Sequence, residues 1–362
     1  MSRATSQPIT GRGALSNPDG RYETRTHHAV DDGWFTDRSR PTATRWRDET
    51  ARRIISRNAS PDVHFDRSVN PYRGCEHGCV YCFARPTHAF LGHSPGLDFE
   101  QLLYAKRNAA SVLERELANP RYQVAPLALG VNTDAYQPLE RTLKVTRQIL
   151  HVLVETRHPV YLITKSSLIE RDIDLLQDLA RDNLVSAAIS ITTEDTELSR
   201  RMEPRTASPA RRFRTLATLA DAGIPTRLSL SPVIPALNES EIESIVMRAA
   251  RAGAMAAHYG LLRLPHELRA LFPEWLRAHY PLRAERVLKA IRSVRPSSET
   301  GLNDARFGHR QTGEGPRAQL IQDRFDAACK RAGIAHNSRM PALNCRAFTA
   351  PQSMRQLALF GS

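Results

Sequence analysis

Short apolar runs alternate with longer amphipathic stretches between about residue 68 and residue 282. Apolar runs of about four to eight residues bounded by turn residues are typical of buried strands, and apolar positions spaced by three and four are typical of helices. The pattern predicts strands at 68–72, at 103–106 with a continuation at 125–131, and at 160–164, 186–192, 226–231 and 255–261. It predicts helices at 109–118, 139–156, 169–181, 209–222, 239–252 and 266–279.

Strand and helix patterns that alternate in this way indicate a series of βα units. The crossovers are long enough to hold a helix, so consecutive strands run parallel and the helices lie outside the sheet. The count predicts an α/β fold, a partial (β/α)6 TIM-type barrel with an N-terminal extension and a C-terminal helical and irregular tail, rather than a full eightfold barrel. In such a sheet the functional residues gather on the loops at the C-terminal ends of the strands.

The two ends of the chain lack this alternation. Residues 1–60 are polar and rich in arginine, and we expect a flexible or loosely docked basic extension, with Trp34, Phe35 and Trp46 as tethers or as stacking surfaces for a base. Residues 61–282 form the predicted core barrel. Residues 283–362 form a basic helical and irregular region, in which helices are predicted at 283–294 and 317–332 and the tail closes the open side of the barrel or frays.

The chain is strongly basic. It carries 51 Lys and Arg against 38 Asp and Glu, a formal net charge of +13, and only five of the basic residues are lysines. Arginine suits bidentate contacts with phosphate and guanine, although a GC-rich coding bias produces the same composition. DNA or RNA therefore stays open as a partner. No apolar stretch approaches the roughly 18 residues of a membrane span, and the N-terminus has no apolar signal region, so we expect a cytoplasmic protein that does not contact a membrane.

Three of the five cysteines fall within eight residues, Cys75, Cys79 and Cys82, with the spacing C-x3-C-x2-C. Thiolates are the soft ligands of zinc and of iron–sulfur clusters, and three are one fewer than a closed zinc site or a fully ligated cubane requires. Three thiolates on a four-iron cluster leave one iron open to a small molecule. Gly74 and Gly78 supply the tight turns that such a loop needs. The loop follows the first predicted strand, which places it at the functional end of the barrel.

A zinc site is the alternative reading of the same cysteines, with His77 or His88 as the fourth ligand. It would make the chain a zinc-stabilised nucleic-acid-binding protein without catalysis. The absence of a second C-x2-C pair and the confinement of all three thiols to one short loop weigh against it. Cys329 and Cys345 lie far downstream, and we expect inert thiols there without assigning them a role.

The cysteine spacing, with the aromatic Tyr81 before the last cysteine, resembles the radical S-adenosylmethionine (SAM) superfamily over roughly residues 65–280. The resemblance implies that Cys75, Cys79 and Cys82 hold a [4Fe-4S] cluster and that the amino and carboxylate groups of SAM chelate the fourth iron. It further implies a 5′-deoxyadenosyl radical that abstracts a hydrogen from a substrate not identified here. A reductase, flavodoxin or ferredoxin would donate the electron.

The same resemblance implies a set of SAM contacts at the ends of the strands. The Gly-Gly-Glu motif usual after the second strand is absent, and the turn at 130–138 would instead offer Thr133 or Asp134 to the SAM ammonium. Asp134 is equally suited to cap the following helix. At the end of the fourth strand, Ser190 and Thr192 would bind the ribose and the methionine carboxylate. After the fifth strand, Val233 would pack against adenine or belong to the core.

Two stretches, residues 70–75 and 133–140, resemble the branch of the superfamily related to spore photoproduct lyase, which repairs a thymine photodimer in DNA. Lyases of that type use an additional cysteine downstream of the cluster to return a hydrogen atom to the product. No cysteine lies between Cys82 and Cys329 in this chain. The resemblance therefore implies radical chemistry of this branch without implying the same repair reaction.

Overall fold

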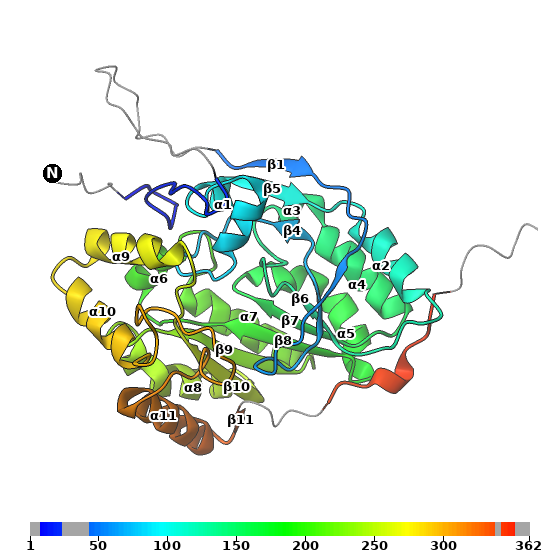
Figure 1. Ribbon diagram of the computed structural model, residues 1–362. Helices are drawn as coiled ribbons and strands as arrows, with labels where there is room; N and C mark the ends of the chain where they lie inside the picture. Colours follow the sequence, from blue (N-terminus) through cyan, green and yellow to red (C-terminus); the bar gives the residue numbers. More distant parts are fainter. Residues whose placement is uncertain (1–7, 24–42, 337–341, 352–362) are drawn as a thin grey trace, which may run out of the picture.

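The computed structural model describes residues 8–23, 43–336 and 342–351. Its body is an eight-stranded sheet with the order β11-β10-β9-β8-β7-β6-β3-β2, drawn in Figure 1. Neighbouring strands are parallel throughout except at β2, which runs antiparallel to β3. The strands are β2 (Ile55–Arg57), β3 (Arg67–Val69), β6 (Leu127–Leu129), β7 (Val160–Thr164), β8 (Val185–Ser190), β9 (Thr226–Val233), β10 (Ala256–Leu261) and β11 (Ala335–His336).

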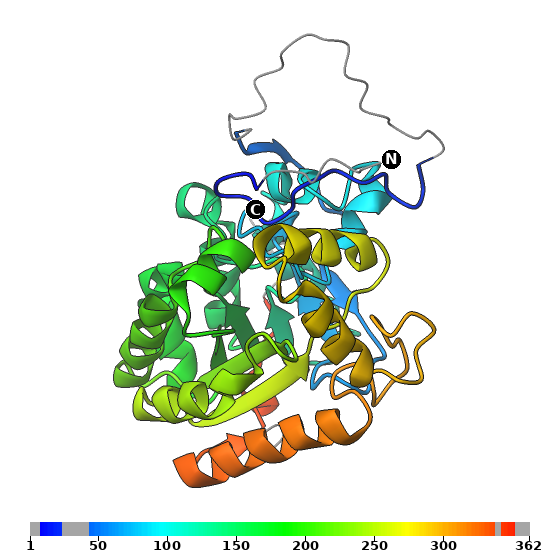
Figure 2. The same ribbon diagram turned by 90° about the vertical axis from the view of Figure 1, so that its left-hand side faces the viewer.

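Helices follow the parallel strands and cover the outside of the curved sheet, as Figure 2 shows from the side. The longer ones are α2 (Ala109–Leu117), α4 (Val145–Glu155), α5 (Ile173–Arg181), α7 (Pro209–Asp221), α8 (Ile242–Arg251), α9 (Leu268–His279), α10 (Ala284–Ser293) and α11 (Pro316–Ala332). The shorter ones are α1 (Asp98–Gln101), α3 (Glu140–Leu143), α6 (Thr196–Met202) and the 3-10 turns η1 (Arg85–Leu91), η2 (Ser167–Asp172), η3 (Glu239–Glu241) and η4 (Cys345–Ala347). In the described ranges, no helix is long and apolar enough to cross a membrane.

The main hydrophobic core lies between the strands and these helices. In β7, Val160 and Leu162 belong to this core while Tyr161 and Ile163 do not, because successive strand residues point to opposite faces. Leu176 and Leu179 on the inner face of α5 pack into the same core. The predicted partial (β/α)6 barrel is thereby confirmed, and its six parallel strands β3, β6, β7, β8, β9 and β10 match the predicted ones closely.

One predicted strand pairing is wrong. The run at 103–106 does not continue into the strand at 125–131. It forms β5 (Leu102–Ala105) in a separate three-stranded sheet with the order β1-β5-β4, whose other members are β1 (Arg45–Asp48) and β4 (Tyr72–Arg73). An apolar run is a local property of the chain, whereas its hydrogen-bonding partners lie 30 to 60 residues away. The pattern therefore identified a strand without identifying its sheet.

The predicted helix at 139–156 is divided in two. Lys144 has φ +53° and ends α3 before α4 begins. This conformation is unfavourable for a residue with a side chain and cannot continue a right-handed helix. The helix α6 was absent from the prediction because it spans less than two turns; the Asp195 carboxylate caps it by accepting hydrogen bonds from Glu197 and Leu198.

The terminal segments contact the barrel where they are described. Near the N-terminus, the backbone amides of Gly13 and Ala14 donate to Glu100 at 3.0 and 2.8 Å. Trp46 lies in β1 and is 40% exposed, whereas Trp34 and Phe35 lie outside the described residues. At the other end, α11 packs on α8 through an ion pair of Arg324 with Glu243 at 2.6 Å, and β11 adds to the open edge of the sheet at β10.

Candidate functional site

The cysteine loop at residues 75–82 begins just after β4 and lies beyond the C-terminal end of β3. Two backbone hydrogen bonds anchor it, from the Cys75 amide to the Phe99 carbonyl at 2.9 Å and from the Val80 amide to the Met202 carbonyl at 3.0 Å. The turn at Gly78 has φ +66°, and a Cβ there would stand 2.7 Å from Oε2 of Glu100. The loop is thus held from several sides, and its central turn requires glycine.

All three loop cysteines are free thiols; Cys75 and Cys79 are buried and Cys82 is partly buried. Burial, joined by the charge of Asp134 and of the other two thiols, raises the pKa of Cys75 well above its ordinary value. Burial likewise raises the pKa of Cys79 to about 12. Coordination to a metal removes the proton from such a thiol, so metal binding by these cysteines would release protons.

The donor chemistry of the loop fits an iron–sulfur cluster better than a single ion. Over residues 8–23, 43–336 and 342–351, no three side chains of His, Cys, Asp or Glu lie close enough together to hold one metal ion. In a four-iron cluster each thiolate binds a different iron, so the thiolates stand apart around a larger body. The two histidines of the zinc alternative have other partners, His77 with Asp134 and His88 with the Leu102 carbonyl at 3.0 Å.

A buried ion pair supports the loop from beneath. The Arg85 guanidinium donates to the carbonyls of Cys79 at 2.8 Å and Gly78 at 3.0 Å, and it pairs with the Glu100 carboxylate. Neither charged side chain is exposed to solvent. Because hydrogen bonds satisfy both charges, the pair fixes the cysteine turn rather than leaving a buried charge unpaired. Glu100 also receives the N-terminal amides of Gly13 and Ala14, which joins residues 13–14 to the loop.

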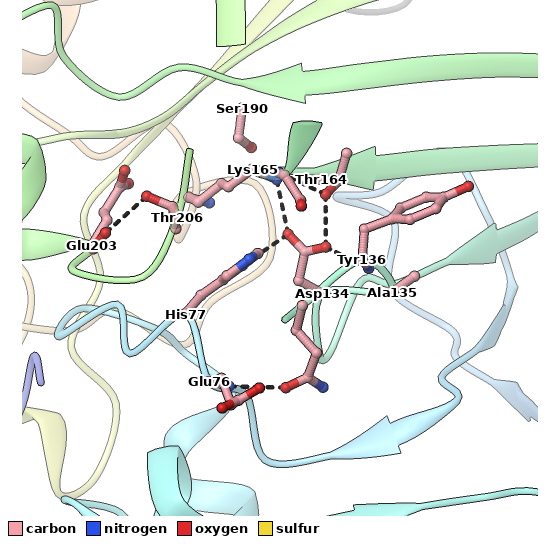
Figure 3. Close-up of polar contacts among 12 residues, drawn as sticks. Glu76, His77, Asp134, Ala135, Tyr136, Thr164, Lys165, Ser190, Glu203 and Thr206 are labelled. Carbon is pink, nitrogen blue, oxygen red and sulfur yellow. Dashed lines mark hydrogen bonds and ion pairs between the residues drawn. The ribbon is translucent and has the colours of Figure 1, made fainter. Parts of the chain in front are cut away.

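The Asp134 carboxylate contacts residues of three loops that follow strands (Figure 3). Its Oδ2 lies 3.2 Å from Nδ1 of His77 and accepts from the Lys165 amide at 2.8 Å. Its Oδ1 accepts from the Thr164 hydroxyl at 2.7 Å and the Tyr136 amide at 2.9 Å. Burial alone would raise the pKa of Asp134, but the charge and hydrogen bond of His77, with the amide and hydroxyl donors, lower it to about 2. The carboxylate is therefore ionised and ties the cysteine loop to the ends of β6 and β7.

Gln137, three residues after Asp134, performs a similar task. Its Oε1 accepts from the Glu76 amide at 2.9 Å, and its Nε2 donates to the Gly74 carbonyl at 3.3 Å. The Glu76 side chain is in turn paired with Arg205 at 3.1 Å. Gly74, Glu76 and Gln137 therefore fix the backbone on both sides of Cys75.

A second buried network reaches the loop from β8 and the segment after α6. The Tyr81 hydroxyl and the Thr192 hydroxyl both donate to Glu203, which pairs with the buried Arg212. Burial pushes the pKa of Glu203 upward, but the charges of Arg212 and Lys165 hold it below the ordinary value. The Lys165 ammonium lies 5.8 Å from the centre of the Tyr81 ring. This places one ammonium group and one aromatic face together beside Cys79 and Cys82.

The sequence-predicted cofactor residues lie in these networks or directly beside them. Thr133 donates to the Tyr72 carbonyl at 3.1 Å and is buried next to Asp134. The Ser190 carbonyl accepts from Arg212 at 3.0 Å, and Figure 3 shows its side chain above Lys165. Val233 ends β9 and is packed in the main hydrophobic core. Thus Thr133, Asp134, Ser190 and Thr192 come together at the mouth of the barrel, while Val233 belongs to its wall.

Sequence reasoning did not find the residues that hold the loop in place. The main ones are Arg85, Glu100, Gln137, Glu203 and Arg212, all fully or almost fully buried. Charged and amide side chains are rarely buried unless they have partners, but a sequence does not tell which arginines are buried. Only the proximity of Arg85 to Cys82 along the chain offered any signal.

Comparison with known proteins matches residues 69–249, half of the chain, to the family model of the Radical SAM superfamily. An uncharacterized protein of Mycobacterium tuberculosis is 37% identical over 218 residues, which cover 59% of this chain and 64% of that protein. An uncharacterized protein of Methanocaldococcus jannaschii is 27% identical over 173 residues, 48% of this chain and 62% of that protein. Each match spans less than two thirds of the relative.

Among solved structures, the chain is similar to spore photoproduct lyase complexed with dinucleoside spore photoproduct, with a TM-score of 0.57 and 13% identity over 80% of this chain and 81% of that one. A variant of that lyase with bound AdoMet and the same dinucleoside gives a TM-score of 0.57 at 12% identity, with the same coverage of both chains. At 12 to 13% identity, this likeness shows a shared fold and nothing beyond it.

Proposed function

The chain belongs to the radical SAM superfamily, and we propose that it is an enzyme that binds a [4Fe-4S] cluster through Cys75, Cys79 and Cys82 and cleaves SAM reductively. When bound, the cluster and SAM supply a one-electron cleavage of the sulfonium and a carbon radical that abstracts a substrate hydrogen. The observation that carries the proposal is a loop of three free thiols held rigidly at the C-terminal mouth of the barrel.

The residues around the loop have separate tasks in this proposal. Arg85 and Gln137 hold the backbone that presents the thiols. Thr133, Ser190 and Thr192 stand at the ends of β6 and β8, where Ser190 can bind a polar group of SAM through its hydroxyl. The Thr133 and Thr192 hydroxyls already donate to the Tyr72 carbonyl and to Glu203, so their oxygens can only accept a hydrogen bond from SAM. Asp134 already accepts four hydrogen bonds or ion contacts, so it orients His77 and the Lys165 amide more readily than it receives a further ammonium group.

We assign to Lys165 the binding of an anionic group of the ligand at the mouth of the barrel. Its ammonium lies over Tyr81 and within electrostatic reach of Cys79 and Glu203. A carboxylate placed there would meet a positive charge on a partly buried side chain, where such an interaction is stronger than in bulk water. The methionine carboxylate of SAM has this chemistry.

The substrate proposal is a nucleic acid or one of its nucleotides. The net charge of +13 favours a polyanion. Next to the last cysteine, Phe83 is 46% exposed, and the Arg263 guanidinium lies 4.9 Å from its ring centre, an arrangement suited to a stacked base. The hydrogen-returning cysteine of the lyase has no equivalent at this mouth, because Cys329 is buried in the main core and Cys345 lies at the other end of the barrel. A different radical reaction from photodimer repair is therefore proposed.

The test begins with anaerobic purification followed by iron and sulfide analysis and electron paramagnetic resonance of the dithionite-reduced protein. The expected result is about four irons per chain, a cubane signal that changes when SAM is added, and formation of 5′-deoxyadenosine. Cys79→Ala should lose both the cluster and SAM cleavage. Cys345→Ala removes a thiol outside the loop and should retain both. A colourless protein that contains stoichiometric zinc, or a cluster that never cleaves SAM, would refute the proposal.

A further inference from the structure

The inside of the barrel differs from that of a filled barrel. In β7 through β10 the residues that face the helices belong to the hydrophobic core, so the residues between them face the interior. Apart from Ile163 and Tyr161, these interior positions carry small or polar side chains. Filled barrels close this space with layers of branched apolar side chains. Tyr161, Arg227 and His258 are each only partly buried, which shows that solvent reaches the interior.

Arg227, the second residue of β9, is the unusual member of this interior. Burial lowers the pKa of its guanidinium, and its Nε has no hydrogen-bond partner. Within the described parts of the chain, no carboxylate forms an ion pair with it, and the guanidinium lies 5.9 Å from the centre of the Tyr161 ring. A charge that is largely withdrawn from water and has no counter-charge is unfavourable, and an anion from outside would relieve it. The arginine is thus available to a ligand.

The strands on either side of β9 carry further polar groups without hydrogen-bond partners. The Ser186 hydroxyl on β8 and Nδ1 of His258 on β10 are buried and make no hydrogen bond. Nε2 of His258 lies 3.0 Å from the Ser229 hydroxyl, so the ring is held in place with its other nitrogen free. Ser186 and Ser229 are nearly inaccessible, at 3% and 1% exposed. A hydroxyl, an imidazole and a guanidinium, each able to donate, therefore stand on three adjacent strands.

A pocket lies at the base of the barrel, below these groups. The pocket, of about 410 Å³, is lined by residues 58–61, 63–66 and 125–126, which directly precede β3 and β6. These positions lie at the N-terminal ends of the strands, opposite the cysteine loop. His64 lines the pocket. Burial, joined by the charge of Arg227, lowers the pKa of His64 and of His258. The pocket and the interior groups are therefore within electrostatic reach of one another.

We propose that Arg227, Ser186 and His258 form a binding site in the lower half of the barrel for the carboxylate or phosphate group of a small molecule, reached through the pocket at the base. A guanidinium binds both anions through two parallel hydrogen bonds, and the hydroxyl and imidazole supply the remaining donors. The site lies at the opposite end of the strands from the thiols and does not depend on the chemistry proposed there.

The test is calorimetric titration of the anaerobically purified full-length protein with inorganic phosphate and, separately, with succinate, at an ionic strength kept constant with sodium chloride. We expect saturable binding of at least one of the two anions, and the two arms decide between phosphate and carboxylate. Arg227→Gln should weaken that binding at least tenfold. Arg286→Gln, at an exposed position on α10, should bind as the wild type does. Equal binding by Arg227→Gln, or loss of binding in Arg286→Gln, would overturn the proposal, as would no binding of either anion.

A second measurement guards against a folding artefact. In buffer without phosphate or carboxylate, Arg227→Met should melt at the same temperature as the wild type or higher, because it removes a buried charge that has no partner. The wild type should gain thermal stability on addition of the binding anion, and the variant should not. A large loss of thermal stability in anion-free Arg227→Met would show that the arginine serves the fold and would refute the site.

Discussion

The Arg85 guanidinium and the Glu100 carboxylate form an ion pair with no solvent exposure directly beneath the cysteine loop. The arginine holds two carbonyls of the loop, and the glutamate holds two amides of the N-terminal segment. The position of the thiols therefore depends on a charge pair that lies outside the cysteine motif.

Breaking this pair from one side should be costly. Glu100→Gln leaves the Arg85 charge buried without a counter-charge, and we expect a loss of roughly 3 to 5 kcal/mol in the free energy of unfolding by urea. The control is Glu285→Gln, which removes a carboxylate paired with Arg277 at 3.0 Å where both side chains are more than half exposed. The control should cost less than about 1 kcal/mol. Equal losses in the two variants would mean that burial does not govern the Arg85 pair.

Asp134→Asn should loosen the cysteine loop. The new amide has only one acceptor oxygen. Its NH2 group must therefore face one of the two donor pairs that now donate to the carboxylate, either His77 and Lys165 or Thr164 and Tyr136. We expect a loss of about 1 to 3 kcal/mol in stability and less iron retained after anaerobic reconstitution. Asp174→Asn, at an exposed carboxylate paired with Arg147, is the control and should keep both. Full iron content with unchanged stability in Asp134→Asn would show that Asp134 does not hold the cysteine loop in place.

Alanine substitutions at two glycines distinguish the cost of backbone strain from the cost of a steric clash. Gly78 and Gly223 both have positive φ, +66° and +77°, but only at Gly78 would a Cβ meet a neighbour, Oε2 of Glu100 at 2.7 Å. Gly223→Ala should cost about 1 kcal/mol for its backbone conformation alone. Gly78→Ala should cost at least about 1 kcal/mol more, because the Glu100 carboxylate is itself held by three partners. Thermal unfolding of the two variants measures the difference, and equal melting temperatures would show that Glu100 moves aside.

Stability should fall on mild acidification, partly because of His158. Burial lowers the pKa of His158 to about 4. Nε2 of the ring forms a hydrogen bond with the Tyr122 hydroxyl at 2.8 Å. In the unfolded chain a histidine has a pKa of about 6.5, so below that pH the unfolded state binds a proton that the folded state refuses. The stabilising contribution is therefore present above pH 6.5 and is lost as the pH falls toward 4.

Denaturant unfolding at pH 7.5 and pH 5.5 measures this effect. Over this interval His158 should account for a loss of about 1 kcal/mol, and His158→Gln should show a correspondingly smaller decrease. His151→Gln, on the exposed side of α4, should behave as the wild type. If His158→Gln kept the full pH dependence of the wild type, the buried ring would be charged in the folded protein.

The periodicity of the sequence predicted the barrel strands because a βα unit is encoded locally, by apolar spacing and turn residues within about 30 residues. The cysteine spacing in the same way predicted a thiolate loop at the end of the first barrel strand. Those two features determined the fold and the family. The assignments of Thr133, Ser190 and Thr192 to SAM came from the resemblance and stay predictions, although the structure places these residues at one mouth.

Only the tertiary structure decided which distant residues meet. It placed β5 in the small sheet, joined Tyr81 to Glu203 across more than a hundred residues, and set Arg227 facing Tyr161 without a carboxylate. A buried charge acquires its partner, or is left without one, through contacts between elements remote in sequence, and the residue types by themselves carry no record of those contacts. The sequence therefore determined the elements and the thiols, and the folded packing determined what holds the thiols and which side chains meet inside the barrel.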